Sequence, residues 1–149
     1  MLLNNDVFST VIENTPLVSI DLVVLNKQGQ ALLGQRLNRP AKNYWFVPGG
    51  RILKNESLAN AFKRLTKDEL GTEYSIEQAD LLGPFDHFYA DNVFSDKFTT
   101  HYVAIAYILK LTQKLDNLPM NIQHNKYKWF DIDTLMKDKQ VHENTKRYF

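Results

Sequence analysis

The sequence contains no cysteine, no run of basic residues and no long apolar segment. The absence of cysteine excludes a disulfide framework and a thiolate metal site. The 18 basic residues nearly balance the 17 acidic ones, and no basic cluster could follow nucleic-acid phosphates, so we expect no nucleic-acid partner. The apolar run 17–25 is far below the roughly 20 residues of a membrane-spanning helix, and residues 1–6 lack a basic leader region. We therefore expect no membrane association and a cytoplasmic protein.

The sequence also has no internal repeat, low-complexity tract or linker, and 44% of its residues are hydrophobic while 23% are charged. This composition is typical of one ordinary domain, which we expect to span 1–149. Hydrophobic patterning predicts a mixed sheet between helices. The expected strands are 17–25, 31–36, 45–47, 79–87, 98–111 and 126–130, and the expected helices are 6–13, 56–70, 133–137 and one from 143.

The stretch 49–71 organises the prediction, because a glycine turn leads directly into an amphipathic helix. Its apolar residues recur at helical spacing on one face, namely Leu58, Ala61, Phe62 and Leu65. Asn55 is suited to the N-cap, and Gly71 stands where a left-handed residue ends a helix. These signals predict a helix over Glu56 to Leu70.

The far end of this helix carries two adjacent carboxylates, Asp68 and Glu69. We expect both to face the cavity beside the turn at Gly49 and Gly50, where glycine exposes backbone carbonyls. Oxygen ligands of this kind suit a hard cation such as Mg²⁺. The stretch therefore predicts a magnesium site.

Other polar residues are candidates for the same site. Asp21 interrupts an apolar strand, where an unpaired carboxylate is costly to bury, so it faces either a polar site or a structural partner. Arg36 and Arg51 follow the hairpin and the glycine turn, and two forked cations fit a diphosphate. Strand alternation places His101 and Tyr102 on opposite faces. His124 is expected in a loop, where a histidine is either solvated or catalytic.

The residues at fixed spacing in stretch 49–71 resemble the signature of the Nudix hydrolases, and they are Gly50, Glu56, Arg64, Asp68, Glu69 and Gly71. Two positions depart from that signature, because Leu65 and Asp68 stand where the family usually has glutamate. Fewer carboxylates favour one Mg²⁺ over a cluster of cations. The resemblance implies an α/β fold, the Nudix-type α/β/α sandwich with a mixed β-sheet.

A closer resemblance covers nearly the whole chain. The segments NTPLVSID, LLGQRLNRPAKNYWFVPGGR, KRLTKDELG, DHFY and FTTHYV, with the later QH, are similar to a divergent Nudix branch that hydrolyses GDP-mannose. This likeness implies a homodimer that binds a GDP-sugar and one Mg²⁺ per subunit, which Mn²⁺ can replace. It also implies residue roles. Metal ligands would be Gly49, Glu69 and Gln123; the catalytic group would comprise His124 as base, Arg36, Arg51, Asp21, His87 and Tyr102; the substrate contacts would include Leu2, Leu3, Phe8 and Arg36.

The reaction that follows is attack of water on the anomeric carbon of GDP-mannose or GDP-glucose, with inversion and with GDP as the leaving group. Two alternatives stay open. One is a Nudix pyrophosphatase that attacks phosphorus in a nucleoside diphosphate sugar and releases a nucleoside monophosphate and a sugar phosphate; Asp68 favours it. The other is a non-catalytic nucleotide-sugar sensor, against which Glu69, Gln123 and His124 argue.

Overall fold

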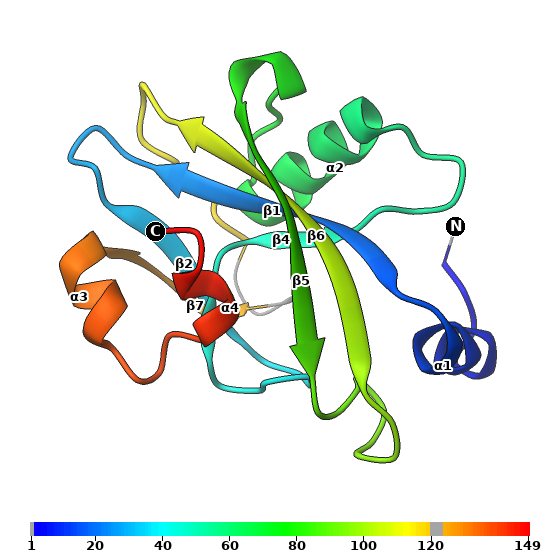
Figure 1. Ribbon diagram of the computed structural model, residues 1–149. Helices are drawn as coiled ribbons and strands as arrows, with labels where there is room; N and C mark the ends of the chain where they lie inside the picture. The colour runs from blue at the N-terminus through cyan, green and yellow to red at the C-terminus, as the bar shows by residue number, and fades with distance from the viewer. Residues whose placement is uncertain (1, 120–123) are drawn as a thin grey trace.

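The computed structural model describes residues 2–119 and 124–149, and its centre is a seven-stranded mixed sheet (Figure 1). Strand β1 pairs in parallel with β6 and antiparallel with β2 and β4. The main path runs β3-β2-β1-β6-β5, while β4 pairs with β1 and β7 with β2. The strands are β1 (Leu17–Leu25), β2 (Ala31–Arg36), β3 (Trp45–Phe46), β4 (Gly49–Arg51), β5 (Asp80–Tyr89), β6 (Thr100–Lys110) and β7 (His124–Phe130).

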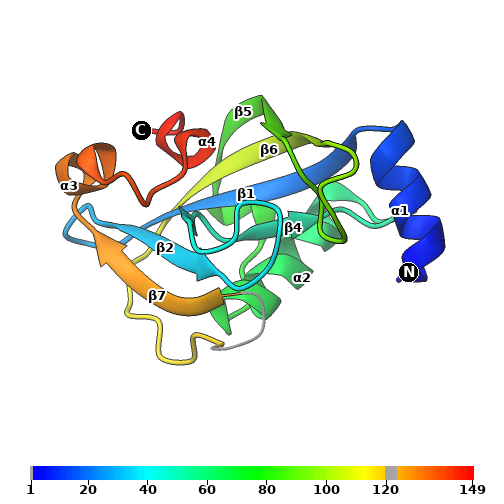
Figure 2. The ribbon, with the colours of Figure 1, turned by 90° about the horizontal axis from the view of Figure 1, so that it is seen from below.

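Helices cover both faces of this sheet (Figure 2). Leu22 and its neighbours at alternate positions of β1 pack on Phe62 and Leu65 of helix α2 (Leu58–Leu70). Val23 points the other way, into a second core that includes Leu135. That core lies under α3 (Ile132–Lys137) and α4 (Glu143–Lys146). The period-two alternation of a strand buried on both sides thus produces two cores, and the expected α/β/α sandwich with a mixed sheet is confirmed.

The predicted start of the central helix is wrong by two residues. Asn55 adopts a left-handed φ of 67°, which no N-cap uses, and Ser57 instead caps the helix by accepting a hydrogen bond from the Asn60 N–H at 3.1 Å. Glu56 lies outside the helix. Gly71 ends it with φ 74° as expected, because glycine meets no Cβ penalty in this conformation.

The remaining boundaries lie within a few residues of the predicted ones. Helix α1 (Asn5–Asn14) precedes β1, and a short 3₁₀ helix (Ile76–Gln78) follows α2. The expected loop position of His124 is wrong, because the backbone of His124 begins β7, opposite Arg36. None of the helices in the described ranges is long and apolar enough to cross a membrane.

Candidate active site

A cavity of about 320 Å³ lies beside the glycine turn, where β1, β2 and β4 meet the ends of β5 and β6. The fold brings together in its wall seven of the residues to which the sequence analysis gives a site role: Phe8, Asp21, Arg36, Gly49, Arg51, His87 and Tyr102. They come from α1 and from five strands, so only the folded sheet assembles them.

Two arginines supply the positive charge of this cavity. The Arg36 guanidinium lies over the Phe46 ring at 5.1 Å, and that of Arg51 over the Phe8 ring at 4.7 Å. Neither forms an ion pair within the described ranges. The pairing of β2 with β7 shifts register between Gln35 and Arg36, an irregularity of the kind that re-aims a side chain. Both forks are therefore available to a diphosphate, which guanidinium binds through paired hydrogen bonds.

Gly49 and Glu69 lie side by side, as a shared cation site requires. The Gly49 N–H donates to Glu69 Oε1 at 3.2 Å, and the Glu69 side chain is buried. The Tyr127 hydroxyl donates to the Glu69 backbone carbonyl at 3.0 Å and fixes the end of α2. A carboxylate beside a backbone turn is an oxygen donor set that fits Mg²⁺, so these two residues fit the implied metal.

Asp68 does not face the cavity, and the expected carboxylate pair is wrong. Its side chain is 59% exposed and lies 3.6 Å from Arg64 Nη1, one helical turn back. Adjacent helical residues point about 100° apart, so Asp68 and Glu69 separate. Leu65 packs directly beneath Gly50, and Glu56 is paired with Arg64. Within the described part of the turn and helix, Glu69 is thus the one buried carboxylate beside the glycine turn.

Asp21 both lines the cavity and has a structural partner. Its Oδ2 accepts a hydrogen bond from the Tyr148 hydroxyl at 2.5 Å. Burial raises the pKa of Asp21 to about 6, although the Tyr148 hydrogen bond and the Arg36 charge oppose the rise. His87 lies next to this pair and is almost fully buried, and burial together with the Arg147 charge lowers its pKa to about 4. At neutral pH the cavity therefore presents a carboxylate and a neutral imidazole.

His101 and Tyr102 separate as strand alternation predicts. Tyr102 lines the cavity, and burial raises its pKa. His101 lies on the opposite face, where its Nε2 is 3.2 Å from Asp86 Oδ1 and its ring stacks on Phe88. His101 is therefore outside the site.

Three predicted residues, Leu2, Leu3 and Glu69, are not among those that line the cavity, and two more, Gln123 and His124, have side chains outside the described part of the structure. Leu2 is 89% exposed, and Leu3 is partly buried before α1. Gln123 falls outside the described residues, so the third metal ligand stays a prediction. His124 is placed only by its backbone, at the start of β7. Its role as a base also stays a prediction.

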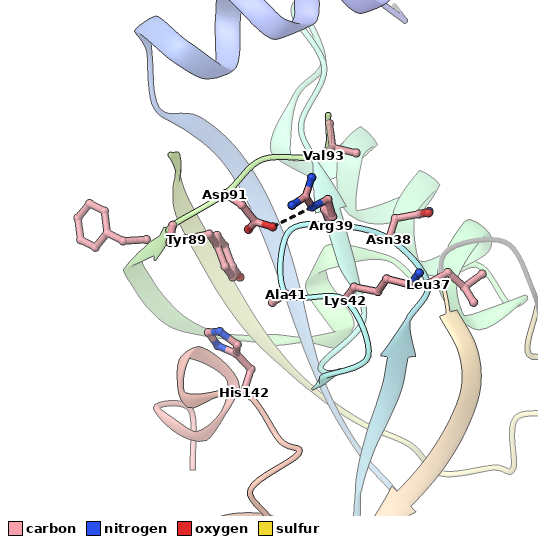
Figure 3. A pocket seen from close by; sticks show the side chains of 11 residues that line it. Leu37, Asn38, Arg39, Ala41, Lys42, Tyr89, Asp91, Val93 and His142 are labelled. Carbon is pink, nitrogen blue, oxygen red and sulfur yellow. Dashed lines mark ion pairs between the residues drawn. The ribbon is translucent and has the colours of Figure 1, made fainter. Parts of the chain in front are cut away.

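A second cavity, of about 630 Å³, adjoins the first (Figure 3). The two share Asn38, Arg39, Tyr89 and Val93. Arg39 stands between them and pairs with Asp91 at 3.2 Å, and it also contacts Asp96. Arg39 lines both cavities, so its pairing does not distinguish them; Arg36 and Arg51 line the first cavity and not the second.

Sequence reasoning missed Tyr148, Arg39 and Tyr89. Tyr148 and Asp21 are 127 residues apart, and no periodicity or spacing predicts a contact at that separation. Tyr89 ends the segment DHFY, where an aromatic side chain on a strand equally indicates core.

Comparisons with known proteins agree with this architecture. Residues 15–149 match the NUDIX domain family model. The chain is 42% identical to the low-salt glycan biosynthesis protein Agl8 of Haloferax volcanii over 127 residues, which are 85% of this chain and 78% of that protein. It is 29% identical to an RNA pyrophosphohydrolase of Orientia tsutsugamushi (strain Boryong), covering 86% of this chain and 66% of that one. A MutT NUDIX hydrolase from Burkholderia pseudomallei shares the fold, with TM-score 0.71, 24% identity and coverage of 91% and 96%.

Members of this family generally use divalent metals such as Mg²⁺ or Mn²⁺, which suits the oxygen donors at Gly49 and Glu69. Because the family model matches residues 15–149, which are most of the chain, the chain belongs to the Nudix family and is a hydrolase of nucleoside diphosphate derivatives.

Proposed function

We propose that the protein hydrolyses GDP-mannose, and also GDP-glucose, to GDP and the free sugar by attack of water at the anomeric carbon with inversion. One observation carries the proposal: the described part of the glycine turn and helix α2 offers a single buried carboxylate, Glu69. Leu65 packs under Gly50, and Asp68 points to solvent. Attack at phosphorus commonly relies on two cations that clamp the attacking and leaving oxygens, and a turn with one carboxylate is poorly suited to hold them.

Attack at carbon places different demands on the site. The diphosphate then departs intact, so its negative charge must be stabilised as a whole. Arg36 and Arg51 face the same cavity without a neutralising partner in the described ranges. Their forks match phosphate oxygens. The positive charge that develops at the anomeric carbon is favoured by a nearby carboxylate, and Asp21 lines this cavity.

Gly49 and Glu69, with Gln123 as the third ligand, would hold one Mg²⁺ that offsets charge on the diphosphate. His124 would take the proton from the attacking water, a role suited to neutral imidazole near pH 7. The backbone of His124 begins β7 opposite Arg36, a placement that supports a role near the diphosphate. Similarity to a relative named for glycan biosynthesis supports a nucleotide sugar as the substrate. The choice of guanine and a homodimeric state are part of the proposal.

Hydrolysis of GDP-mannose with Mg²⁺ in oxygen-18 water tests the proposal. Mass spectrometry and NMR should find the label on the sugar, β-mannose as the first sugar product, and unlabelled GDP. Label on phosphate, with GMP and mannose 1-phosphate, would instead establish a pyrophosphatase, the activity class of the RNA pyrophosphohydrolase relative. No turnover of any nucleotide sugar would favour a sensor.

The base is tested separately. His124→Ala should lower turnover by about two to four orders of magnitude while Mg²⁺ binding stays nearly intact. His101→Ala is the matched control, because His101 lies on the other face and pairs with Asp86. Unchanged turnover in the His124 variant would remove that residue from the mechanism.

A further inference from the structure

The hydroxyl of Tyr148 lies between two residues of the candidate site. It is 2.5 Å from Asp21 Oδ2 and 3.1 Å from His87 Nε2. Tyr148 follows α4 as the second-last residue of the sequence, and its ring packs edge-on against Phe85. Both Tyr148 and His87 are at least nine-tenths buried. The C-terminal segment therefore reaches the cavity wall through one hydrogen-bonding group.

This hydroxyl fixes the direction of the hydrogen bonds. A phenol has one proton, and the Asp21 carboxylate can only accept, so Tyr148 donates to Asp21. The phenol oxygen then accepts from His87, whose Nε2 must carry the hydrogen. Burial and the Arg147 charge keep His87 neutral, which leaves its Nδ1 unprotonated. The chain of donors runs from His87 through Tyr148 to Asp21.

The other atoms of the two side chains are left as acceptors. Asp21 Oδ1 lies beside Gly49, so close that an added Cβ there would be 2.7 Å away. His87 Nδ1 is 3.9 Å from Asp21 Oδ2, beyond hydrogen-bond distance. No hydrogen bond from the described residues reaches Asp21 Oδ1 or His87 Nδ1, and both residues line the cavity. Acceptors of this kind recognise donors, which on a GDP-sugar are the N–H groups of the base and the hydroxyl groups of the ribose and of the sugar.

We propose that Tyr148 is a positioning residue of this active site, which holds Asp21 and His87 so that their free acceptor atoms receive hydrogen bonds from hydroxyl groups of the substrate. The inference rests on the proposed function, because it takes a glycosyl compound as the ligand. Tyr148 acts through Asp21 and His87 and does not itself touch the reacting atoms.

The first test needs no substrate. Long-range ¹H–¹⁵N NMR spectra of the 17.4 kDa protein at neutral pH report which ring nitrogen of each histidine is protonated. For His87 we expect hydrogen on Nε2 in the wild type and loss of that preference in Tyr148→Phe. Tyr107→Phe is the control, because Tyr107 is an equally buried tyrosine that packs on Phe62 away from the cavity. Wild-type His87 with hydrogen on Nδ1 would overturn the proposal.

The second test is a double-mutant cycle with GDP-mannose. Tyr148→Phe should lower kcat on the order of 10- to 100-fold through misplaced groups, with GDP affinity unchanged because Arg36 and Arg51 are untouched. In an Asp21→Asn background the same change should lower kcat by a clearly smaller factor than in the wild type, with the residual effect exerted through His87. If the loss of kcat in the double variant equals the product of the two single losses, Tyr148 does not act through Asp21. A thermal scan of each variant separates these outcomes from unfolding.

The outcomes of these tests distinguish failure of the role of Tyr148 from failure of the proposed function. If oxygen-18 labels phosphate, attack at carbon is wrong, yet the histidine measurement still decides whether Tyr148 orders His87. If the label is on the sugar and the cycle is multiplicative, the function stands and the role of Tyr148 falls.

Discussion

Arg64 donates two hydrogen bonds to Glu56, from Nε to Oε2 at 2.7 Å and from Nη2 to Oε1 at 3.0 Å. The same Nη2 donates to the backbone carbonyl of Arg51 at 2.9 Å. One guanidinium therefore ties the loop after β4 to helix α2. Arg51 is one of the two cavity arginines without an ion pair in the described ranges, so we expect this tie to couple the stability of the loop to the binding of the diphosphate.

We expect Glu56→Gln to weaken that tie. The change removes the charge from a partly buried, two-point pair, and hydrogen bonds to charged groups contribute about 1.5–3 kcal/mol, so the free energy of unfolding should fall by roughly 1–3 kcal/mol. GDP affinity should fall as well, because Arg51 is less well held. Urea unfolding and calorimetric titration with GDP measure the two effects.

Glu73→Gln provides the matched control for Glu56, because Glu73 is exposed after the end of α2. It should change neither quantity by more than about 0.5 kcal/mol. If Glu56→Gln behaves like this control, the ion pair does not hold the loop.

Gly49 and Gly50 should differ sharply in their tolerance of alanine. A Cβ on Gly49 would lie 2.4 Å from the Ile20 carbonyl oxygen and 2.7 Å from Asp21 Oδ1, and backbone cannot move aside. A Cβ on Gly50 would meet the Leu65 side chain, with Cδ2 at 2.6 Å and Cγ at 3.9 Å. We expect Gly50→Ala to cost about 1–3 kcal/mol of stability, as overpacking does, and Gly49→Ala to cost more and to abolish turnover.

Leu65→Val tests the cause of the Gly50 effect. It removes the clashing end of the side chain, so it should recover much of the stability lost in Gly50→Ala while leaving Gly49→Ala unimproved. Thermal unfolding of the single and double variants gives the answer, and equal rescue of both glycine variants would contradict the stated contacts.

The sequence predicted the strands well because their signal is local. Leu17–Leu25 and Ala31–Arg36 match the prediction residue for residue, since apolar runs bounded by turn residues leave little choice. The start of α2 was misplaced because Asn55 and Ser57 are both good caps, and only the left-handed φ of Asn55 distinguishes them.

The site was predictable only in part. Arg36, Arg51, Asp21 and His87 were singled out by residue type and family resemblance, and the fold brings them to one cavity. The prediction that Asp68 and Glu69 face the same cavity was wrong, because neighbouring residues on a helix point in different directions. Tyr148 was missed because its contact with Asp21 depends on how the last helix packs on the sheet, which is a property of the tertiary structure.

His87 should make stability depend on pH. Its pKa is about 4 in the folded protein against the ordinary value of 6.5, so the unfolded chain takes up a proton first and stability is lost as pH falls from 6.5 to 4. A shift of that size corresponds to about 3 kcal/mol. Asp21 acts oppositely, because its raised pKa of about 6 means that the folded state takes up the proton first over part of the same range.

The two contributions nearly cancel in the wild type, and His87→Gln should separate them. The variant keeps a donor for Tyr148 but cannot titrate, so we expect it to gain about 2–3 kcal/mol relative to the wild type between pH 7 and pH 4.5. Urea unfolding at both pH values measures this gain. His101→Gln, at a more exposed site on the other face, should show little of it; an equal gain there would assign the effect to general charge.

The last prediction contrasts the two carboxylates at the end of α2. Asp68→Asn should leave the Mg²⁺ dependence and the turnover of GDP-mannose nearly unchanged, because the Asp68 side chain is 59% exposed and pairs with Arg64. Glu69→Gln should weaken Mg²⁺ binding and lower turnover by at least about 100-fold, because it neutralises the one buried carboxylate at the described turn. Titration with Mg²⁺, followed by activity and by calorimetry, measures both. A large loss of turnover in Asp68→Asn would mean that Asp68 turns inward to hold a second cation. It would then favour attack at phosphorus over attack at carbon.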